Sequence, residues 1–218
     1  LNLLEKSNYK EIDEVNLKNI NKNYNKNLYE FISPDGNVAA YINDFNLWIR
    51  NTKTDKRTQL TFDGIKDYGY ATNNAGWIQS KGPVLKWSPK SDKIATFRQD
   101  AREVGEMYLT STNVGHPKLQ AWKYALPGDE KIFEIERLII DIKSKKIIKL
   151  KMENDFQRST TTDHIAGRGG ELLDAQWSED SSKLAFISSS RDHKEAHLQI
   201  ADSKTGNVRS VFKENVKT

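Results

Sequence analysis

Serine and histidine side chains are the first candidates for hydrolytic or metal chemistry, and this chain carries them without a catalytic arrangement. No Gly-x-Ser-x-Gly sequence occurs, so the strained turn that presents a serine nucleophile is missing from these residues. Ser88 and Ser178 lie in polar turns, where we expect structural roles. His193 and His197 have a spacing that suits a metal on a helix, but the local pattern predicts turn and strand. We therefore expect no catalytic residue, no metal site and no cofactor here.

A run of charges after a predicted core strand is the best candidate for ligand contact. The strand ends near Phe97, and the charged side chains that follow it include Arg98, Asp100, Arg102 and Glu103. Charges in this position either face a central channel or form a solvated ion-pair cluster, in which each pair contributes only ~0–1 kcal/mol. The sequence leaves both interpretations open.

The bulk composition of the 218 residues excludes several classes of function. The net charge of +4 is small, and the Lys and Arg residues are scattered, which argues against nucleic-acid binding. No stretch approaches the ~18 apolar residues of a membrane span. The chain has no cysteine, which excludes disulfides and thiolate metal sites.

An internal repeat indicates the elements that would position the charged run. Three segments, beginning at Phe31, Lys86 and Gln176, each place Ser after an apolar or aromatic residue, then a polar turn, then a short apolar strand. Each segment is followed by two further predicted strands, in which apolar and polar residues alternate, with a polar turn between them. These pairs begin at Leu47, Leu138 and Leu198. Two hairpins give four antiparallel strands, which is one blade of a β-propeller.

These repeats predict an all-β partial propeller of about three four-stranded blades. The expected blades cover residues 31–62, 83–151 and 171–213, and the middle blade carries an insertion at 100–131. Residues 1–30 contain eight Asn and no Gly or Pro, and form a polar lead-in or an incomplete blade. About three blades do not close a ring, so we expect further blades outside this chain. A complete three-repeat structure is the alternative, but it would leave a sheet face exposed.

The middle of the chain resembles the propeller domain of the dipeptidyl peptidase IV branch of the prolyl oligopeptidase clan. The resemblance is carried by the phrases Leu60-Thr-Phe-Asp-Gly64, Asp67-Tyr-Gly-Tyr70, Val84-Leu-Lys-Trp-Ser-Pro89, Lys93-Ile-Ala-Thr-Phe97 and Ala121-Trp-Lys-Tyr-Ala-Leu-Pro-Gly128. It continues more weakly to the C-terminus. The ordered combination is more specific than Ser-Pro-Asp-Gly, which many propellers share.

The resemblance implies an eight-bladed propeller that screens substrates for a serine peptidase. In this family the Ser-Asp-His triad lies in a C-terminal α/β-hydrolase domain, absent from this chain, which releases dipeptides from free N-termini. The insertion forms an arm that helps to make a homodimer, and here its apolar contacts would be Val114, Leu119, Trp122, Tyr124 and Leu126. Relatives from Gram-negative bacteria are commonly exported, which implies a periplasmic location.

The sequence departs from the family where two Glu residues would bind the substrate ammonium. After Asp67-Tyr-Gly-Tyr70 come Asn73 and Asn74, which carry no charge, followed by Trp77. Asp67, Glu103 or Glu106 could supply a carboxylate instead. Residues 69–77 could equally form a plain connection anchored by Trp77. The alternative function is a non-enzymatic propeller that binds protein partners, similar to TolB-like or WD-type scaffolds.

Overall fold

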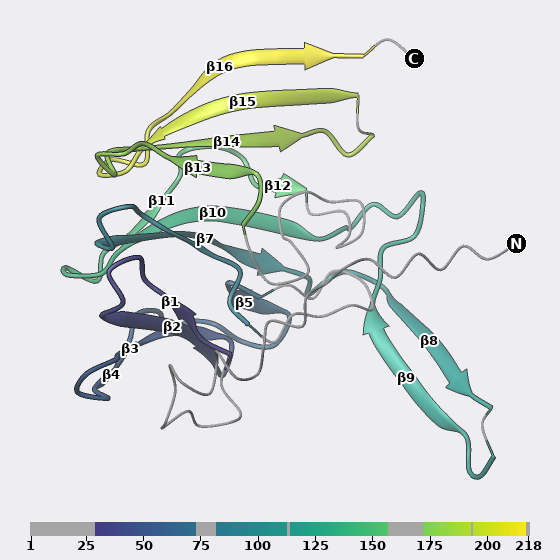
Figure 1. Cartoon of the computed structure of the whole chain (residues 1–218). Coiled ribbons are helices and arrows are strands. Elements are labelled where there is room, and N and C mark those ends of the chain that lie inside the picture. The colour runs from purple at the N-terminus through teal and green to yellow at the C-terminus, as the bar shows by residue number, and fades with distance from the viewer. Residues whose placement is uncertain (1–28, 73–81, 113, 157–171, 193, 217–218) are drawn as a thin grey trace, which may run out of the picture.

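Three stacked antiparallel sheets and one projecting hairpin make up the part of the chain that the structure describes (Figure 1). The structure is a computed structural model that describes residues 29–72, 82–112, 114–156, 172–192 and 194–216. All regular elements in these ranges are strands, which confirms the all-β prediction. The described residues include no helix that could cross a membrane.

The first sheet has four strands in chain order, β1-β2-β3-β4. The second has the order β11-β10-β7-β5, with β6 also paired to β7 and β12 to β10. The third has the order β13-β14-β15-β16, and β8 pairs with β9 in the hairpin. The strand bounds are β1 Phe31–Ile32, β2 Val38–Asn43, β3 Asn46–Asn51, β4 Arg57–Gln59, β5 Tyr68–Tyr70, β6 Lys86–Trp87, β7 Lys93–Asp100, β8 Glu106–Ser111, β9 Lys118–Lys123, β10 Glu134–Asp141, β11 Ile147–Lys149, β12 Asp155–Phe156, β13 Ala175–Trp177, β14 Lys183–Ser189, β15 Glu195–Asp202 and β16 Val208–Asn215.

A serine hydroxyl closes the same turn in each sheet. Ser33 Oγ accepts a hydrogen bond from the backbone N–H of Val38, five residues further along the chain, at 3.1 Å. In the same way, Ser88 Oγ accepts from Lys93 N at 2.9 Å, and Ser178 Oγ accepts from Lys183 N at 3.0 Å. Each hydroxyl donates to a nearby Asp carboxylate. In the first sheet, bonds from Ser33 and Asn37 hold the pKa of Asp35 at about 2. The turn chemistry therefore explains why Ser recurs at these positions.

The second sheet is buried on both faces. Toward the first sheet, Leu138 and Ile140 of β10 pack in a cluster with Leu47 and Trp87. Toward the third sheet, Ile139 packs with side chains that include Phe97, Trp177 and Phe186. Because alternate residues of a strand point to opposite faces, β10 must be apolar at successive positions. This burial explains the apolar run at Leu138–Ile140.

Two tryptophans repeat one contact between neighbouring sheets. Trp87 Nε1 of the second sheet donates to Phe31 O of the first at 3.1 Å. Trp177 Nε1 of the third sheet donates to Lys86 O of the second, also at 3.1 Å. Phe31 and Lys86 occupy the same repeat position, two residues before the turn serine. The first-to-second and second-to-third junctions therefore share one geometry.

Candidate binding site

The candidate site lies where β7 ends and where β5 and β10 begin, which we call the charged end of the second sheet. Tyr68 of β5 lies opposite Asp100 of β7, and Asp100 lies opposite Glu134 of β10. The chain leaves β7 at this point, forms the β8–β9 hairpin, which we call the arm, and returns to β10 (Figure 1). The backbone N–H of Ala101 donates to Asp67 O at 2.8 Å, which fixes the departing chain to the turn before β5.

Arg98 is buried at the charged end and is neutralised by two carboxylates. Its Nη1 lies 2.7 Å from Asp63 Oδ2, and its Nη2 lies 2.8 Å from Glu136 Oε2. The guanidinium also lies 4.2 Å from the ring centroid of Tyr68. A hydrogen bond from Tyr70 and the charge of Arg98 lower the pKa of Asp63. Since both terminal nitrogens of the guanidinium are engaged by carboxylates, Arg98 serves mainly to hold the strands together here.

Arg102 is the exposed counterpart of Arg98 on the same aromatic ring. Its guanidinium lies 3.9 Å from the Tyr68 centroid and forms a two-point pair with Asp100, at 2.9 Å from Nε and 2.6 Å from Nη2. These bonds lower the pKa of Asp100. Planar bidentate pairing of this kind fixes the orientation of both side chains.

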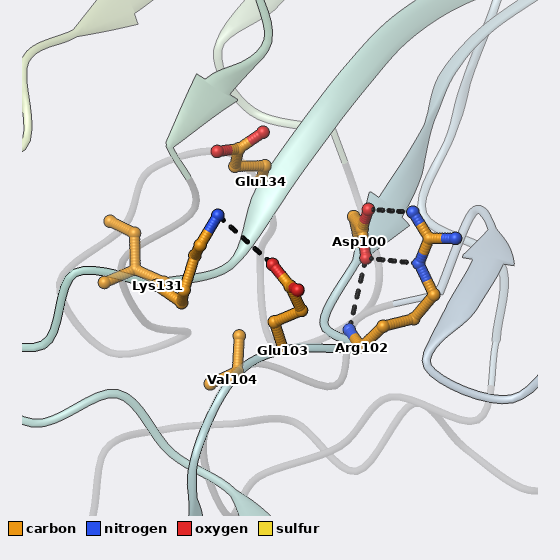
Figure 2. A pocket seen from close by; sticks show the side chains of 7 residues that line it. Asp100, Arg102, Glu103, Val104, Lys131 and Glu134 are labelled. Atoms are coloured by element: carbon orange, nitrogen blue, oxygen red, sulfur yellow. Dashed lines mark hydrogen bonds and ion pairs between the residues drawn. The ribbon is translucent and has the colours of Figure 1, made fainter.

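A hollow of about 490 Å³ opens beside this pair (Figure 2). Its walls come from the end of β7, the segments that lead into and out of the arm, and the start of β10. Lys131 Nζ lies 3.1 Å from Glu103 Oε2, and this pairing raises the pKa of Lys131. The lining side chains are Asp100, Arg102, Glu103, Val104, Lys131, Ile132 and Glu134. Three carboxylates and two cations face the hollow, so its walls carry one net negative charge.

The structure brings together only some of the residues proposed from the sequence. Asp100, Arg102 and Glu103 line one hollow, Arg98 lies behind them, and Asp67 occupies the adjoining turn with φ of 62°. Asn73, Asn74 and Trp77 lie outside the described residues. Lys131 and Glu134 were not singled out from the sequence, although Lys131 is the last residue of the expected insertion and Glu134 begins the apolar strand that follows it. That placement was the available signal.

A second hollow of about 350 Å³ lies between the second and third sheets. Behind it, Arg137 of β10 is buried, with Nε 2.5 Å from Asp155 Oδ2 and Nη2 bonded to Asp174. Its Nη2 also donates to Ile187 O of β14 at 3.1 Å. Burial raises the pKa of Asp174, against the opposing effect of Arg137. Arg137 is thus an ionic link between two sheets.

The histidines form no metal centre in the described residues. No group of three or more His, Cys, Asp or Glu side chains there could hold a metal ion. His116 is exposed near the arm tip, and His197 Nε2 lies 3.4 Å from Glu195 Oε2. His164 and His193 lie outside the described residues.

The arm places apolar side chains in solvent. Val114 and Leu119 near its tip are fully and two-thirds exposed, whereas Trp122 is half-buried. Tyr124 and Leu126 lie at the root, where Tyr124 N donates to Gly105 O and Leu126 N to Asp129 Oδ2. Tyr108 and Leu109 of β8 are also exposed, although the sequence did not single them out.

Antiparallel sheets, two of four strands and one of six, stack through a recurring tryptophan contact, and this arrangement defines the class of protein as a partial β-propeller. Within that class, residues 5–218 match the model of the Dipeptidyl peptidase IV (DPP IV) N-terminal region, and the chain belongs to this family. The resemblance inferred from the sequence is therefore confirmed. No protein in a comparison with curated sequences matches the chain significantly.

Two solved bacterial structures share the fold. Dipeptidyl peptidase 4 of Porphyromonas gingivalis superimposes with a TM-score of 0.67 at 16% identity, over 86% of this chain and 26% of its own. A candidate dipeptidyl aminopeptidase IV of Bacteroides ovatus gives 0.63 at 18% identity, over 87% and 24%. The chain thus spans about a quarter of the length of these two relatives.

Proposed function

We propose that this chain is part of the substrate-screening propeller of a serine peptidase and helps to position peptide amino termini for hydrolysis. The hydrolysis itself would take place in an α/β-hydrolase domain on another part of the polypeptide. The family match over residues 5–218 is the observation that carries the proposal. The proposed consecutive blades are residues 31–62, 83–151 with the insertion 100–131, and 171–213. The proposed location of the protein is periplasmic or exported.

The hollow at the charged end supports this role chemically. Its excess negative charge favours a cationic ligand over an anionic one, and a peptide amino terminus carries one positive charge near neutral pH. A charge-assisted hydrogen bond to an ammonium is roughly twice as strong as a neutral one. Asp100, Arg102 and Glu103 belong to this proposed site, with Asp67 beside it and Arg98 supporting it. Asn73, Asn74 and Trp77 remain proposed lining residues.

The proposal is tested by comparing the complete natural polypeptide with this chain alone. We expect the complete protein to hydrolyse Ala-Pro-p-nitroanilide and a serine-directed inhibitor to abolish that activity, whereas the isolated chain hydrolyses nothing. Inhibitor-sensitive turnover by the isolated chain would contradict the proposed division of labour. A complete protein that folds but cleaves no dipeptidyl substrate would favour a non-enzymatic scaffold instead.

The arm is the proposed contact between two copies of the complete protein. Replacing exposed Leu119 with Lys should weaken the dimer at least ~10-fold, because a charge would have to be buried in the contact. The fold itself should change by only about 0.5 kcal/mol. Sedimentation of the complete protein across a concentration series measures the dissociation constant of the dimer. Phe62→Lys is the matched control, since Phe62 is 74% exposed and lies outside the arm. A monomeric wild type, or equal effects of both variants, would argue against the arm contact.

A further inference from the structure

Six turns lie together at the end of the sheets opposite the arm, on the left in Figure 1. Each sheet contributes an inner turn, which follows β1, β6 or β13, and an outer turn, which precedes β4, β11 or β16. The inner turns are residues 33–37, 88–92 and 178–182, and the outer turns are residues 52–56, 142–146 and 203–207. We call the surface that they form the turn face.

Hydrogen bonds join the six turns into one surface. Between the first two sheets, the backbone N–H of Asp35 donates to Ser91 Oγ at 3.1 Å. Between the second and third sheets, the backbone N–H of Lys90 donates to Ser181 Oγ at 3.2 Å. Within each sheet, the first residue of the outer turn donates its N–H to a carbonyl of the inner turn at 2.9–3.0 Å. Because stacked sheets lie ~10 Å apart, the three outer turns form a row about 20 Å long.

Each outer turn presents a lysine followed by a hydroxyl residue at the same position. These exposed pairs are Lys53-Thr54, Lys143-Ser144 and Lys204-Thr205. Each pair begins two residues after an Asn or Asp whose Oδ1 accepts a hydrogen bond from the N–H of the hydroxyl residue, at 2.7–2.9 Å. One turn geometry therefore presents the same two chemical groups three times along the row.

The outer turns form a basic row, whereas the inner turns form an acidic one. The outer turns contain six lysines, all exposed, and none of these lysines forms an ion pair with a described residue. Their one acidic residue, Asp55, pairs with Arg50 at 3.3 Å. The inner turns contain one lysine and four acidic residues, Asp35, Asp92, Glu179 and Asp180. Two strand spacings, ~10 Å, separate the basic row from the acidic row.

This pattern distinguishes between kinds of anionic partner. A flat anionic membrane would meet the acidic row together with the basic row, which would cancel much of the attraction. Single-stranded nucleic acids stack their bases on aromatic rings, and the six turns contain no aromatic residue. Protein partners use large apolar or aromatic anchors, and none of the large exposed apolar side chains lies in these turns. A narrow polymer that carries both acidic groups and hydroxyls fits the basic row best.

We propose that the row of outer turns binds a linear anionic polysaccharide, whose acidic groups pair with the lysines and whose hydroxyls donate to Thr54, Ser144 and Thr205. The hydroxyls of Ser144 and Thr205 donate their own protons to Asp141 and Asp202, and their oxygens can still accept. The repeat of the polymer would thus follow the repeat of the blades. This binding does not depend on the proposed peptidase function. It would leave the charged end of the second sheet accessible, because that end lies at the other end of the strands.

The test measures binding of a fluorescent heparin hexasaccharide to the complete protein. Dextran and a single-stranded oligonucleotide with the same charge as the hexasaccharide serve as comparisons. We expect the wild type to bind the hexasaccharide at least ~10-fold more tightly than either, and more weakly as the salt concentration rises. The triple variant Lys53→Gln, Lys143→Gln and Lys204→Gln should weaken binding about 10-fold or more, because three modest ion pairs are lost together.

The matched control is the triple variant Lys66→Gln, Lys118→Gln and Lys194→Gln. It removes the same charge from three exposed lysines outside the turn face, so we expect less than about a threefold change. Equal effects of the two triple variants, or a hexasaccharide bound no more tightly than dextran, would overturn the proposal. So would an oligonucleotide that binds as tightly as the hexasaccharide, or binding to phosphatidylglycerol vesicles that the turn-face variant loses. Circular dichroism melting confirms that each variant is folded.

Discussion

Replacing Arg137 with methionine is expected to lower the free energy of unfolding by about 3–5 kcal/mol. The side chain of Arg137 is only 4% exposed and forms ion pairs with Asp155 and Asp174, which are 9% and 6% exposed. Methionine would fill much of the space but leave two carboxylates without a cation in a buried site. Their desolvation, rather than the lost attraction alone, makes the change severe. Urea denaturation of the chain measures the difference.

Two further variants distinguish this mechanism from a simple loss of volume. Arg102→Met removes an arginine paired with Asp100, but Arg102 is 51% exposed, so we expect a much smaller loss of stability than for Arg137→Met. The triple variant with Arg137→Met, Asp155→Asn and Asp174→Asn should recover part of the loss, because it leaves no unpaired charge. If Arg137→Met and Arg102→Met cost the same, Arg137 does not provide a buried ionic link between the sheets.

Gly206→Ala is expected to destabilise the junction between the second and third sheets by about 2–5 kcal/mol. Gly206 has φ of +71°, and a Cβ there would lie 2.2 Å from Lys149 O and 3.1 Å from Ile148 Cγ2. The left-handed backbone alone costs a residue with a Cβ ~1–2 kcal/mol. The overlap would force the turn away from β11 at a further cost of ~1–3 kcal/mol. This movement of the turn would also strain the hydrogen bond from Lys151 N to Gly206 O.

Gly36→Ala isolates the backbone part of this effect, so that the difference between the two variants gives the steric part. Gly36 has nearly the same φ, +73°, but no atom lies within 4 Å of a Cβ built there. We therefore expect Gly36→Ala to cost only the backbone part, about 1–2 kcal/mol. Thermal and urea unfolding of both variants give the comparison. Equal losses would show that the third sheet does not rest against Lys149 as described.

The sequence predicted the repeating strands because each blade carries its own local signals. Ser33, Ser88 and Ser178 mark turns through short-range hydrogen bonds, and the apolar stretches that follow alternate with the period of a strand. Trp87 and Trp177 directly precede Ser88 and Ser178, so their equivalence is visible in the sequence for the same reason. These features depend on residues close together in the chain, which a single sequence displays directly.

The site was predicted only in part because it depends on register between distant strands. The run from Arg98 to Glu103 was visible as charge after a strand, but Glu134 and Phe156 are brought beside it by pairing across β7, β10 and β12. Arg137 has a weaker signal, a charge within an apolar strand at a position that shares a face with Ile135 and Ile139. The apolar strand around Arg137 indicates that its side chain is buried, but it does not indicate which carboxylates form ion pairs with it.

The central structural claim is that adjoining sheets are consecutive propeller blades joined by one repeated contact, and indole hydrogen exchange tests it directly. The indole N–H groups of Trp87 and Trp177 donate to carbonyls of the preceding sheet. By NMR, we predict that both exchange at least ~100-fold more slowly than a free indole, since opening a sheet junction should cost about 3 kcal/mol or more. Exchange of both indoles at the rate of a free indole, in a folded chain, would contradict the stacking on which the proposed site depends.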